Sequence, residues 1–211
     1  ISTFGNSQSF GDLTEARFLT GRSSSETRGL FAGGDPGPSN SDIIDYVTMA
    51  SGGNAQDFGN LTASGRCPGG ASSSTRAIFA GGYAPSGTTP NASMDTVDAF
   101  TVETLGDSID FNNLGSVLSA GSGFADATRA FHCGGVGPVS SQYSTIVNTI
   151  QFCIFSSTAD FVDFGDLSDT QGYQSSFSDK TRGIVAGGGY GYVNLIEYVT
   201  MQSSGNAVDF G

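Results

Sequence analysis

A Thr-Arg pair occurs four times in this chain, and the arginine of each pair stands eighteen residues after a phenylalanine and five residues before a Gly-Gly pair. The pairs are Thr27-Arg28, Thr75-Arg76, Thr128-Arg129 and Thr181-Arg182. The phenylalanines that open these copies, and the one that would open a fifth, are separated by 48, 53, 53 and 46 residues: Phe10, Phe58, Phe111, Phe164 and Phe210. Internal periods near 50 residues are typical of propellers and stacked arrays. The chain is therefore one structural unit repeated four times.

Differences in length between the copies are confined to one segment in each copy. These variable segments are residues 35–43, 83–96, 136–149 and 189–195, which contain 9, 14, 14 and 7 residues. Selection for a binding surface on a fixed framework produces this pattern. Drift produces it too, because loops tolerate insertions better than strands do. The pattern alone leaves both explanations open.

The composition favours an all-β protein. Of the 211 residues, 37% are hydrophobic, only 13% are charged and 32 are glycine, which fits a turn-rich β fold better than a helical one. The net charge of −12 argues against nucleic acid as a partner, since affinity for a phosphate backbone comes from cationic side chains. Solubility is the simplest role of the acidity. No run of 18 apolar residues occurs, so we expect no membrane insertion.

The N-terminus and the cysteines add little. The chain begins at Ile1 without a basic and apolar leader, which suggests a processed product or an excerpt from a longer chain. The cysteines are odd in number and lack CxxC spacing, so the sequence supports neither a disulfide framework nor a zinc site: Cys67, Cys133 and Cys153. Cys133 takes the position of Ala32, Ala80 and Ala186, and we expect it to be a small buried residue.

Comparison of the copies predicts four strands in each. One group starts at Thr-Arg and ends before Gly-Gly, with apolar residues on both faces: residues 27–32, 75–80, 128–133 and 181–186. A second group is rich in Tyr, Val, Thr and Ile: residues 44–49, 97–102, 150–155 and 196–201. A third group ends at the repeated phenylalanine: residues 54–58, 108–111, 160–164 and 206–210. The Ser/Gly-rich stretch before each Thr-Arg pair is long enough for a fourth strand.

Four-stranded antiparallel units repeated around an axis form propeller blades, in which both faces of a sheet are buried against neighbouring sheets. We therefore predict a single β-propeller domain over residues 1–211, with blades at residues 12–59, 60–111, 112–164 and 165–211. Residues 1–11 are expected to be an extra copy of the last strand. Five last strands for four blades fit either a closed four-blade ring with a spare strand or part of a larger ring. The closed ring is favoured, since four blades lie within the known range.

The repeats resemble kelch repeats in three elements. An apolar strand closes on Gly-Gly in every copy, a second apolar or aromatic strand follows the variable segment, and a later aromatic residue precedes leucine. The first element is Phe31-Ala32-Gly33-Gly34, Phe79-Ala80-Gly81-Gly82, His132-Cys133-Gly134-Gly135 and Val185-Ala186-Gly187-Gly188. Kelch repeats usually carry tryptophan at the later aromatic position, whereas this chain has phenylalanine and contains no tryptophan. The resemblance implies a propeller of kelch-like repeats, each 46–53 residues long.

Longer phrases extend the resemblance over nearly the whole chain. The phrases IDYVTMASGGNAQDFGNLT at residues 44–62 and IEYVTMQSSGNAVDFG at residues 196–211, together with TRGLFAGG and TRGIVAGG, look like the kelch-like repeats of virion structural and tail-associated proteins of marine bacteriophages. The resemblance implies a viral protein located at the virion surface or outside the cell.

A charged residue recurs at two positions of the repeat. Four arginines begin the Thr-Arg strands, and four aspartates precede the repeated phenylalanine: Arg28, Arg76, Arg129 and Arg182, with Asp57, Asp110, Asp163 and Asp209. We predict that they form a structural Arg-carboxylate clamp within or between blades. The alternative is a ring of arginines that captures an anionic ligand in a channel. A residue present in every blade more often stabilises the blade.

The sequence predicts no enzymatic activity. Each Gly-Gly pair leads from a strand into a strand, so no helix N-terminus is available to hold a phosphate. His132 is the only histidine and takes the strand position of Phe31, Phe79 and Val185, where a core residue is expected. We predict no catalytic residue, no cofactor and no metal site, although the first variable segment contains oxygen ligands of the kind calcium uses: Asp35, Asn40, Ser41 and Asp42.

The four variable segments are expected to lie on one face, because the loop between the second and third strands of a blade lies beside the connection to the next blade. Candidate binding residues on this face are Asp35, Asn40, Tyr83, Asn91, Tyr143, Tyr190 and Tyr192. Tyrosine supplies contact area at little cost in rotamer entropy. We expect a non-enzymatic virion structural or host-attachment module that binds a host surface glycan or a neighbouring virion protein. The alternatives are a secreted carbohydrate-active enzyme on a propeller scaffold and an architectural subunit of a homo-oligomer.

Overall fold

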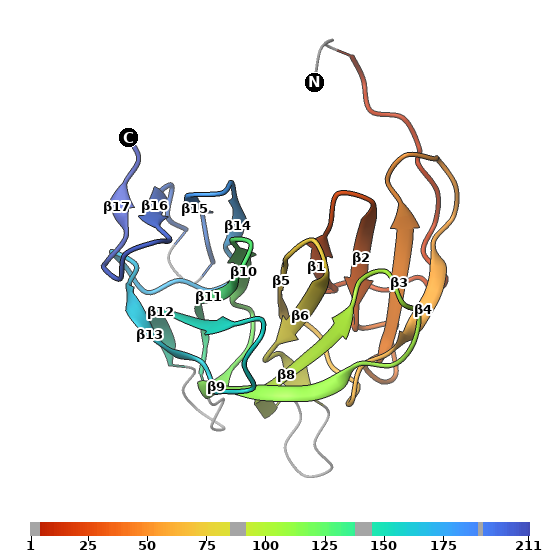
Figure 1. Ribbon diagram of the computed structural model, residues 1–211, viewed down its shortest axis with the longest axis horizontal. Coiled ribbons are helices and arrows are strands. Elements are labelled where there is room, and N and C mark those ends of the chain that lie inside the picture. Colours follow the sequence, from red (N-terminus) through yellow and green to blue (C-terminus); the bar gives the residue numbers. More distant parts are fainter. Residues whose placement is uncertain (1–4, 85–91, 138–144, 190–191) are drawn as a thin grey trace.

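The computed structural model describes residues 5–84, 92–137, 145–189 and 192–211. It contains four antiparallel sheets arranged as the blades of a β-propeller (Figure 1). The all-β fold class and the four-stranded, four-blade architecture predicted from the repeats are confirmed. Within the described residues, no helix is long and apolar enough to cross a bilayer.

Each blade takes its strands in chain order. Blade 1 contains β1 (Gly21–Ser24), β2 (Arg28–Ala32), β3 (Ile43–Thr48) and β4 (Gln56–Asn60). Blade 2 contains β5 (Gly69–Ser72), β6 (Arg76–Ala80), β8 (Ala92–Thr101) and β9 (Ile109–Leu118), with the short β7 (Tyr83–Ala84) paired to the start of β8. Blade 3 contains β10 (Ser122–Ala125), β11 (Arg129–Val136), β12 (Ile146–Ile154) and β13 (Val162–Asp166). Blade 4 contains β14 (Ser175–Ser178), β15 (Arg182–Ala186), β16 (Ile196–Thr200) and β17 (Val208–Asp209).

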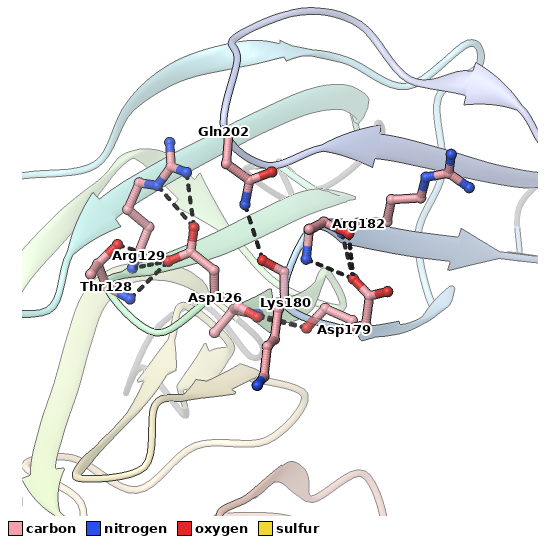
Figure 2. Close-up of polar contacts among 10 residues, drawn as sticks. Asp126, Thr128, Arg129, Asp179, Lys180, Arg182 and Gln202 are labelled. Atoms are coloured by element: carbon pink, nitrogen blue, oxygen red, sulfur yellow. Dashed lines mark hydrogen bonds and ion pairs between the residues drawn. The ribbon is translucent and has the colours of Figure 1, made fainter.

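The recurring Thr-Arg pair closes the hairpin between the first and second strands of each blade. In blade 3, one carboxylate oxygen of Asp126 accepts hydrogen bonds from the backbone N–H groups of Thr128 and Arg129, both at 2.8 Å (Figure 2). Asp179 repeats these two contacts in blade 4, and Ser25 and Ser73 use their hydroxyls in the same way in blades 1 and 2. Side chains of Asp and Ser favour such turns because they can hydrogen-bond the backbone two residues on.

The hydrophobic core lies between the blades. One cluster joins Leu30, Tyr46 and Phe58 of blade 1 to Phe79 and Phe100 of blade 2, where the rings of Phe58 and Phe100 are 4.7 Å apart. Equivalent clusters join blade 2 to blade 3 and blade 3 to blade 4. Each blade therefore packs one face against the blade that follows. We call this face the front face, and we call the face that it contacts on the next blade the back face. This arrangement explains why the strands are apolar on both faces.

The ring is open between blade 4 and blade 1. Strand β1 contacts β5, β5 contacts β10 and β10 contacts β14, whereas the sheets of blades 1 and 4 stand apart at the two ends of the series (Figure 1). On the back of blade 1, Met49 is 52% exposed, although the equivalent Val102, Phe155 and Met201 are buried. The expectation of a closed four-blade ring is thus wrong. The reason is that three packed interfaces fix the angle between blades, and at that angle the fourth interface does not form.

Candidate functional site

All four variable segments begin at the same end of the propeller. Their first residues form backbone bridges with the segment that leads into the first strand of the same repeat: Phe18 with Asp35, Arg66 with Tyr83, Ser119 with Val136 and Gly172 with Gly189. The first residues of the four segments thus lie at one end, as expected for segments that share one face. We call this end of the propeller the loop end.

A ladder of backbone hydrogen bonds runs from blade to blade at the loop end. The N–H of Cys67 donates to the carbonyl of Leu19 at 2.7 Å, that of Ala120 to Cys67 at 3.1 Å, and that of Tyr173 to Ala120 at 2.7 Å. All four residues have a left-handed backbone, with φ between 53° and 60°. This conformation is costly for residues other than glycine and persists only where surrounding contacts enforce it. No sequence pattern indicates the ladder, because the four positions share no residue type.

Two of the predicted binding residues are part of the structure that holds the blades together. Asp35 is buried and forms an ion pair with Arg66, whose guanidinium lies 6.0 Å from the centre of the Tyr83 ring. Tyr83 is buried in a cluster with Cys67, Ala120 and Val136. The prediction that Asp35 and Tyr83 form a binding surface is therefore wrong. Packing against the neighbouring connection removes both side chains from solvent.

The other predicted binding residues are more exposed than Asp35 and Tyr83 or lie outside the described residues. Asn40 is half-buried, and its amide Nδ2 donates to the carbonyl of Tyr83 at 2.9 Å. Tyr192 is 95% exposed. Asn91, Tyr143 and Tyr190 lie outside the described residues. Among the predicted binding residues that the structure describes, Tyr192 alone has its whole side chain in solvent.

The predicted Arg-Asp clamp does not form. Within the described part of the chain, none of the ion pairs joins Arg28, Arg76, Arg129 or Arg182 to Asp57, Asp110, Asp163 or Asp209. Asp57 and Asp209 instead accept hydrogen bonds from the backbone N–H two residues on, those of Gly59 and Gly211. The prediction is wrong because local backbone donors lie closer to these carboxylates than the arginines do.

The arginines connect adjacent blades by another route. The guanidinium of Arg28 lies 4.6 Å from the centre of the Tyr46 ring in its own blade and donates to the carbonyl of Val102 in blade 2 at 2.6 Å. Arg76 repeats this arrangement over Phe111 and donates to the carbonyl of Phe155 in blade 3. Arg129 is held instead by Asp126 of its own hairpin at 2.9 Å. These contacts place Arg28 and Arg76 at blade interfaces and do not form a ring of cations around a channel.

A different recurring acceptor holds the connections between blades. The second residue of each motif at residues 44–49, 97–102, 150–155 and 196–201 is buried, and its side-chain oxygen accepts a backbone N–H from the preceding connection. The pairs are Asp45 with Thr14 at 3.1 Å, Asp98 with Thr62 at 2.9 Å, Gln151 with Gly115 at 2.8 Å and Glu197 with Ser168 at 2.8 Å. A polar residue repeated within an apolar motif was the sequence signal for this contact. The clamp prediction overlooked it, because that prediction assigned the recurring carboxylate to Asp57 and its equivalents.

In blade 1 this acceptor also belongs to a buried ion pair. Arg17 donates from Nη2 to Oδ2 of Asp45 at 3.0 Å, and both side chains are completely buried. Thr14 adds a hydroxyl hydrogen bond of 2.6 Å to the same carboxylate. A buried charge without a partner is costly, so each of these two residues depends on the other.

The first strands of all four blades line a central hollow of about 430 Å³. Its serine hydroxyls already serve the contacts between blades. Ser72 donates to the carbonyl of Ser24 at 2.5 Å, and Ser178 donates to that of Ala125 at 2.7 Å. These hydroxyls fasten β5 to β1 and β14 to β10.

His132 is a core residue, as predicted. It is buried, and neither of its ring nitrogens has a hydrogen-bond partner within the described residues. Burial lowers the pKa of His132 to about 4. The cysteines are also buried, and burial raises the pKa of each thiol to about 11, which keeps them protonated and unreactive. Cys133 has the small buried position that the sequence predicts.

Replacement of His132 by phenylalanine is expected to remove part of the loss of stability in acid. The unfolded chain has a histidine pKa near 6.5, whereas the folded pKa is about 4, so the unfolded state binds more protons between these values and stability falls as pH falls through that window. The full effect is about 3 kcal/mol below pH 4. Phenylalanine fits, since Phe79 occupies the equivalent buried position. Urea unfolding of both proteins at pH 7 and pH 4.5 measures the effect, and an equal decline in both would contradict it.

A scan against models of protein families matches none of them, and a search of curated proteins finds no match.

Proposed function

We propose that this protein is a non-enzymatic virion structural and host-attachment module that binds a host surface glycan through the loop end of its kelch-like propeller. Tyr192, which stands 95% exposed in a variable segment of the loop end, is the observation that supports this function best. An exposed aromatic ring offers a flat apolar surface with a polar hydroxyl, and tyrosine is enriched where proteins make contacts. The resemblance of the repeats to those of marine bacteriophage virion proteins supports a place at the virion surface.

The framework beneath the loop end is suited to recognition. The interblade ladder and the partly buried Arg66–Asp35 pair fix the points at which the variable segments begin. Segments of different length thus begin on one fixed framework, which is the arrangement used by many binding proteins. A neighbouring virion protein is the second ligand class that this surface suits.

Substitution of Tyr192 is expected to weaken glycan binding at least about tenfold, because buried aromatic anchors commonly supply more than 1.4 kcal/mol of binding energy. Asparagine is the replacement of choice, since residue 192 has a left-handed φ of 52° that asparagine tolerates. The wild-type protein and Tyr192→Asn are compared on an array of bacterial surface polysaccharides. Equal binding by both proteins contradicts the assignment of Tyr192.

The matched control is Ile109→Ser. Ile109 is also an exposed large apolar residue, but it begins β9 at the end of blade 2 opposite the loop end. Binding by this variant is expected to equal that of the wild type. Release of oligosaccharides from any bound polysaccharide would favour the rival function, a carbohydrate-active enzyme. Absence of binding to every glycan, with capture of a purified virion protein, would favour the architectural function.

A further inference from the structure

Blade 4 exposes the face that blades 1, 2 and 3 each bury against the next blade. We propose that this front face of blade 4 docks onto the back face of blade 1 in a second copy of the chain, so that copies associate head to tail. The proposal goes beyond the function proposed above and does not depend on it.

Both faces expose large apolar side chains. On the front of blade 4, Phe177 is 63% and Phe210 56% exposed, whereas the equivalent Phe124 of blade 3 and Phe164 are buried. On the back of blade 1, Met49 is exposed where its equivalents are buried. Burial of such side chains provides the main driving force for association. The positions of Phe210 and Met49 are buried in the cluster of each internal interface, and that of Phe177 is buried at the two interfaces that blade 3 forms.

The two faces also match in the size of their residues. At the interface between blades 3 and 4, the Phe124 ring lies on Gly183, where a Cβ atom would be 2.1 Å from the ring. The equivalent pair at the interface between blades 2 and 3 is two alanines, Ala71 and Ala130, in one cluster. A large residue on the first strand thus requires glycine on the second strand of the next blade. Among the four first strands, Phe177 is the other large residue at the position of Phe124. Among the four second strands, Gly29 of blade 1 is the other glycine at the position of Gly183.

The polar contact between blades has its equivalent here as well. Arg28 lies over the ring of Tyr46 and donates to the carbonyl of Val102 in the following blade. Arg182 lies in the same way over Tyr198, 4.8 Å from the ring centre, with its side chain exposed. In blade 1, the residue equivalent to Val102 is Met49. Arg182 is therefore positioned to donate to the Met49 carbonyl of a second copy.

The backbone of blade 4 keeps the shape needed for close approach of another blade. A Cβ atom at Gly33, Gly81 or Gly134 would lie 2.3 to 2.5 Å from a carbonyl oxygen of the connection to the next blade. Gly187 has the same left-handed φ, +68°, yet nothing lies within 4 Å of its Cβ position. Gly211 is likewise open, although its equivalents Gly59 and Gly165 approach a carbonyl of the next blade at 2.3 Å. Glycine and a left-handed φ at these open positions are suited to a neighbour that arrives from outside the chain.

A second copy fits these observations better than closure within one chain. The three packed interfaces hold blades 1 and 4 of the same chain apart, so internal closure would require them to rearrange. A second copy meets both faces without any such change. Contacts of this head-to-tail kind produce either closed rings or open filaments, depending on the rotation from one copy to the next.

The N-terminal segment competes for part of the same site. The carbonyl of Phe10 accepts the N–H of Gly53 at 2.8 Å, as the carbonyl of Phe58 accepts that of Gly106. Residues 10–11 thus occupy on blade 1 the place that Phe210 and Gly211 of a docking copy would take. Phe10 is partly exposed, which makes the segment the weaker occupant. Docking is therefore expected to displace it.

Association is tested on the full 211-residue chain by light scattering coupled to size exclusion over a range of concentrations. The wild type is expected to form species larger than the monomer, and Phe177→Ser is expected to weaken association about tenfold or more, since most of a phenylalanine ring loses its burial. Phe177 is exposed in the single chain, so this substitution leaves the fold intact. Val162→Ser, at an exposed position of β13 in blade 3, is the control and should associate as the wild type does.

A cross-link then distinguishes a second copy from internal closure. Chains carrying only Phe177→Cys are mixed with chains carrying only Met49→Cys, a position that is 52% exposed on the back of blade 1, and treated with a short bis-maleimide. The native thiols are buried and do not compete. Covalent dimers in the mixture support the proposal. A chain carrying both substitutions that links within itself and stays monomeric overturns it in favour of a closed ring, and a wild type that is monomeric at every concentration overturns it as well.

Gly11→Ala tests the competition by the N-terminal segment. A Cβ atom at residue 11 would lie 2.1 Å from the carbonyl oxygen of Gly53, so the segment cannot seat on blade 1. This variant is expected to associate several-fold more tightly than the wild type, since the site on blade 1 is then free. Weaker association would contradict the overlap of residues 10–11 with the docking copy.

Discussion

Replacing Asp45 with alanine is expected to lower the free energy of unfolding by about 3 to 5 kcal/mol, which is the usual cost of leaving one member of a buried ion pair alone. Arg17 would keep its charge in a completely buried side chain, and its remaining ion-pair partner would be the 40% exposed Glu15, whose Oε2 lies 3.9 Å from Nη1. Two of its nitrogens, Nε and Nη1, already lack a hydrogen-bond partner within the described residues. Thr14 would also lose the acceptor of its N–H and of its hydroxyl. Chemical denaturation at pH 7 measures the change.

Two further variants make the Asp45 result specific. Asp57→Ala removes an exposed aspartate that accepts one backbone hydrogen bond, and we expect a loss below about 1 kcal/mol. The double variant Arg17→Met with Asp45→Leu replaces the pair by apolar residues and should recover most of the loss, since such replacements are often neutral. If Asp45→Ala and Asp57→Ala cost the same, the buried pair does not stabilise blade 1.

Gly81→Ala and Gly187→Ala are expected to differ in stability although their backbones are alike. Both glycines have a left-handed φ, +67° and +68°, so alanine costs about 1 to 2 kcal/mol at either position. At residue 81 the new Cβ would also lie 2.3 Å from the carbonyl oxygen of Leu118, whereas at residue 187 nothing lies within 4 Å. Crowding of this kind adds about 1 to 3 kcal/mol. Gly81→Ala should therefore be the less stable protein.

Thermal unfolding at low protein concentration measures this difference. Low concentration matters because a docked second copy would cover Gly187 and cause crowding there as well. Equal losses at the two positions would mean that the connection to the next blade does not approach Gly81 as the structure shows.

The sequence determines the blades well because their signals are local. The Thr-Arg pair lies in the hairpin turn between the first two strands of each blade. Its backbone N–H groups are bound there by the side chains of Ser25, Ser73, Asp126 and Asp179. Apolar residues on both faces of a strand indicate packing between sheets. Each of these properties belongs to a few consecutive residues, so a fixed spacing in the sequence reveals it.

The candidate site was less predictable, because contacts between blades decide it. Asp45 and Asp57 both stand at recurring polar positions, and only the position of the preceding connection makes the first a buried acceptor and the second an exposed one. Tyr83 and Tyr192 both belong to variable segments, yet Tyr83 is covered by the neighbouring connection and Tyr192 is not. Closure of the ring depends on the angle between packed sheets, for which a single repeat carries no signal.

The position of the core between the sheets governs how the molecule comes apart. A single sheet buries little of its apolar surface on its own, so its stability depends on the sheets packed against it. Blades 1 and 4 each pack against one neighbour, whereas blades 2 and 3 each pack against two. Amide protons of β2 and β15 are therefore expected to exchange with heavy water sooner than those of β6 and β11. Unfolding is therefore expected to begin in the two outer blades and to reach the two inner blades last.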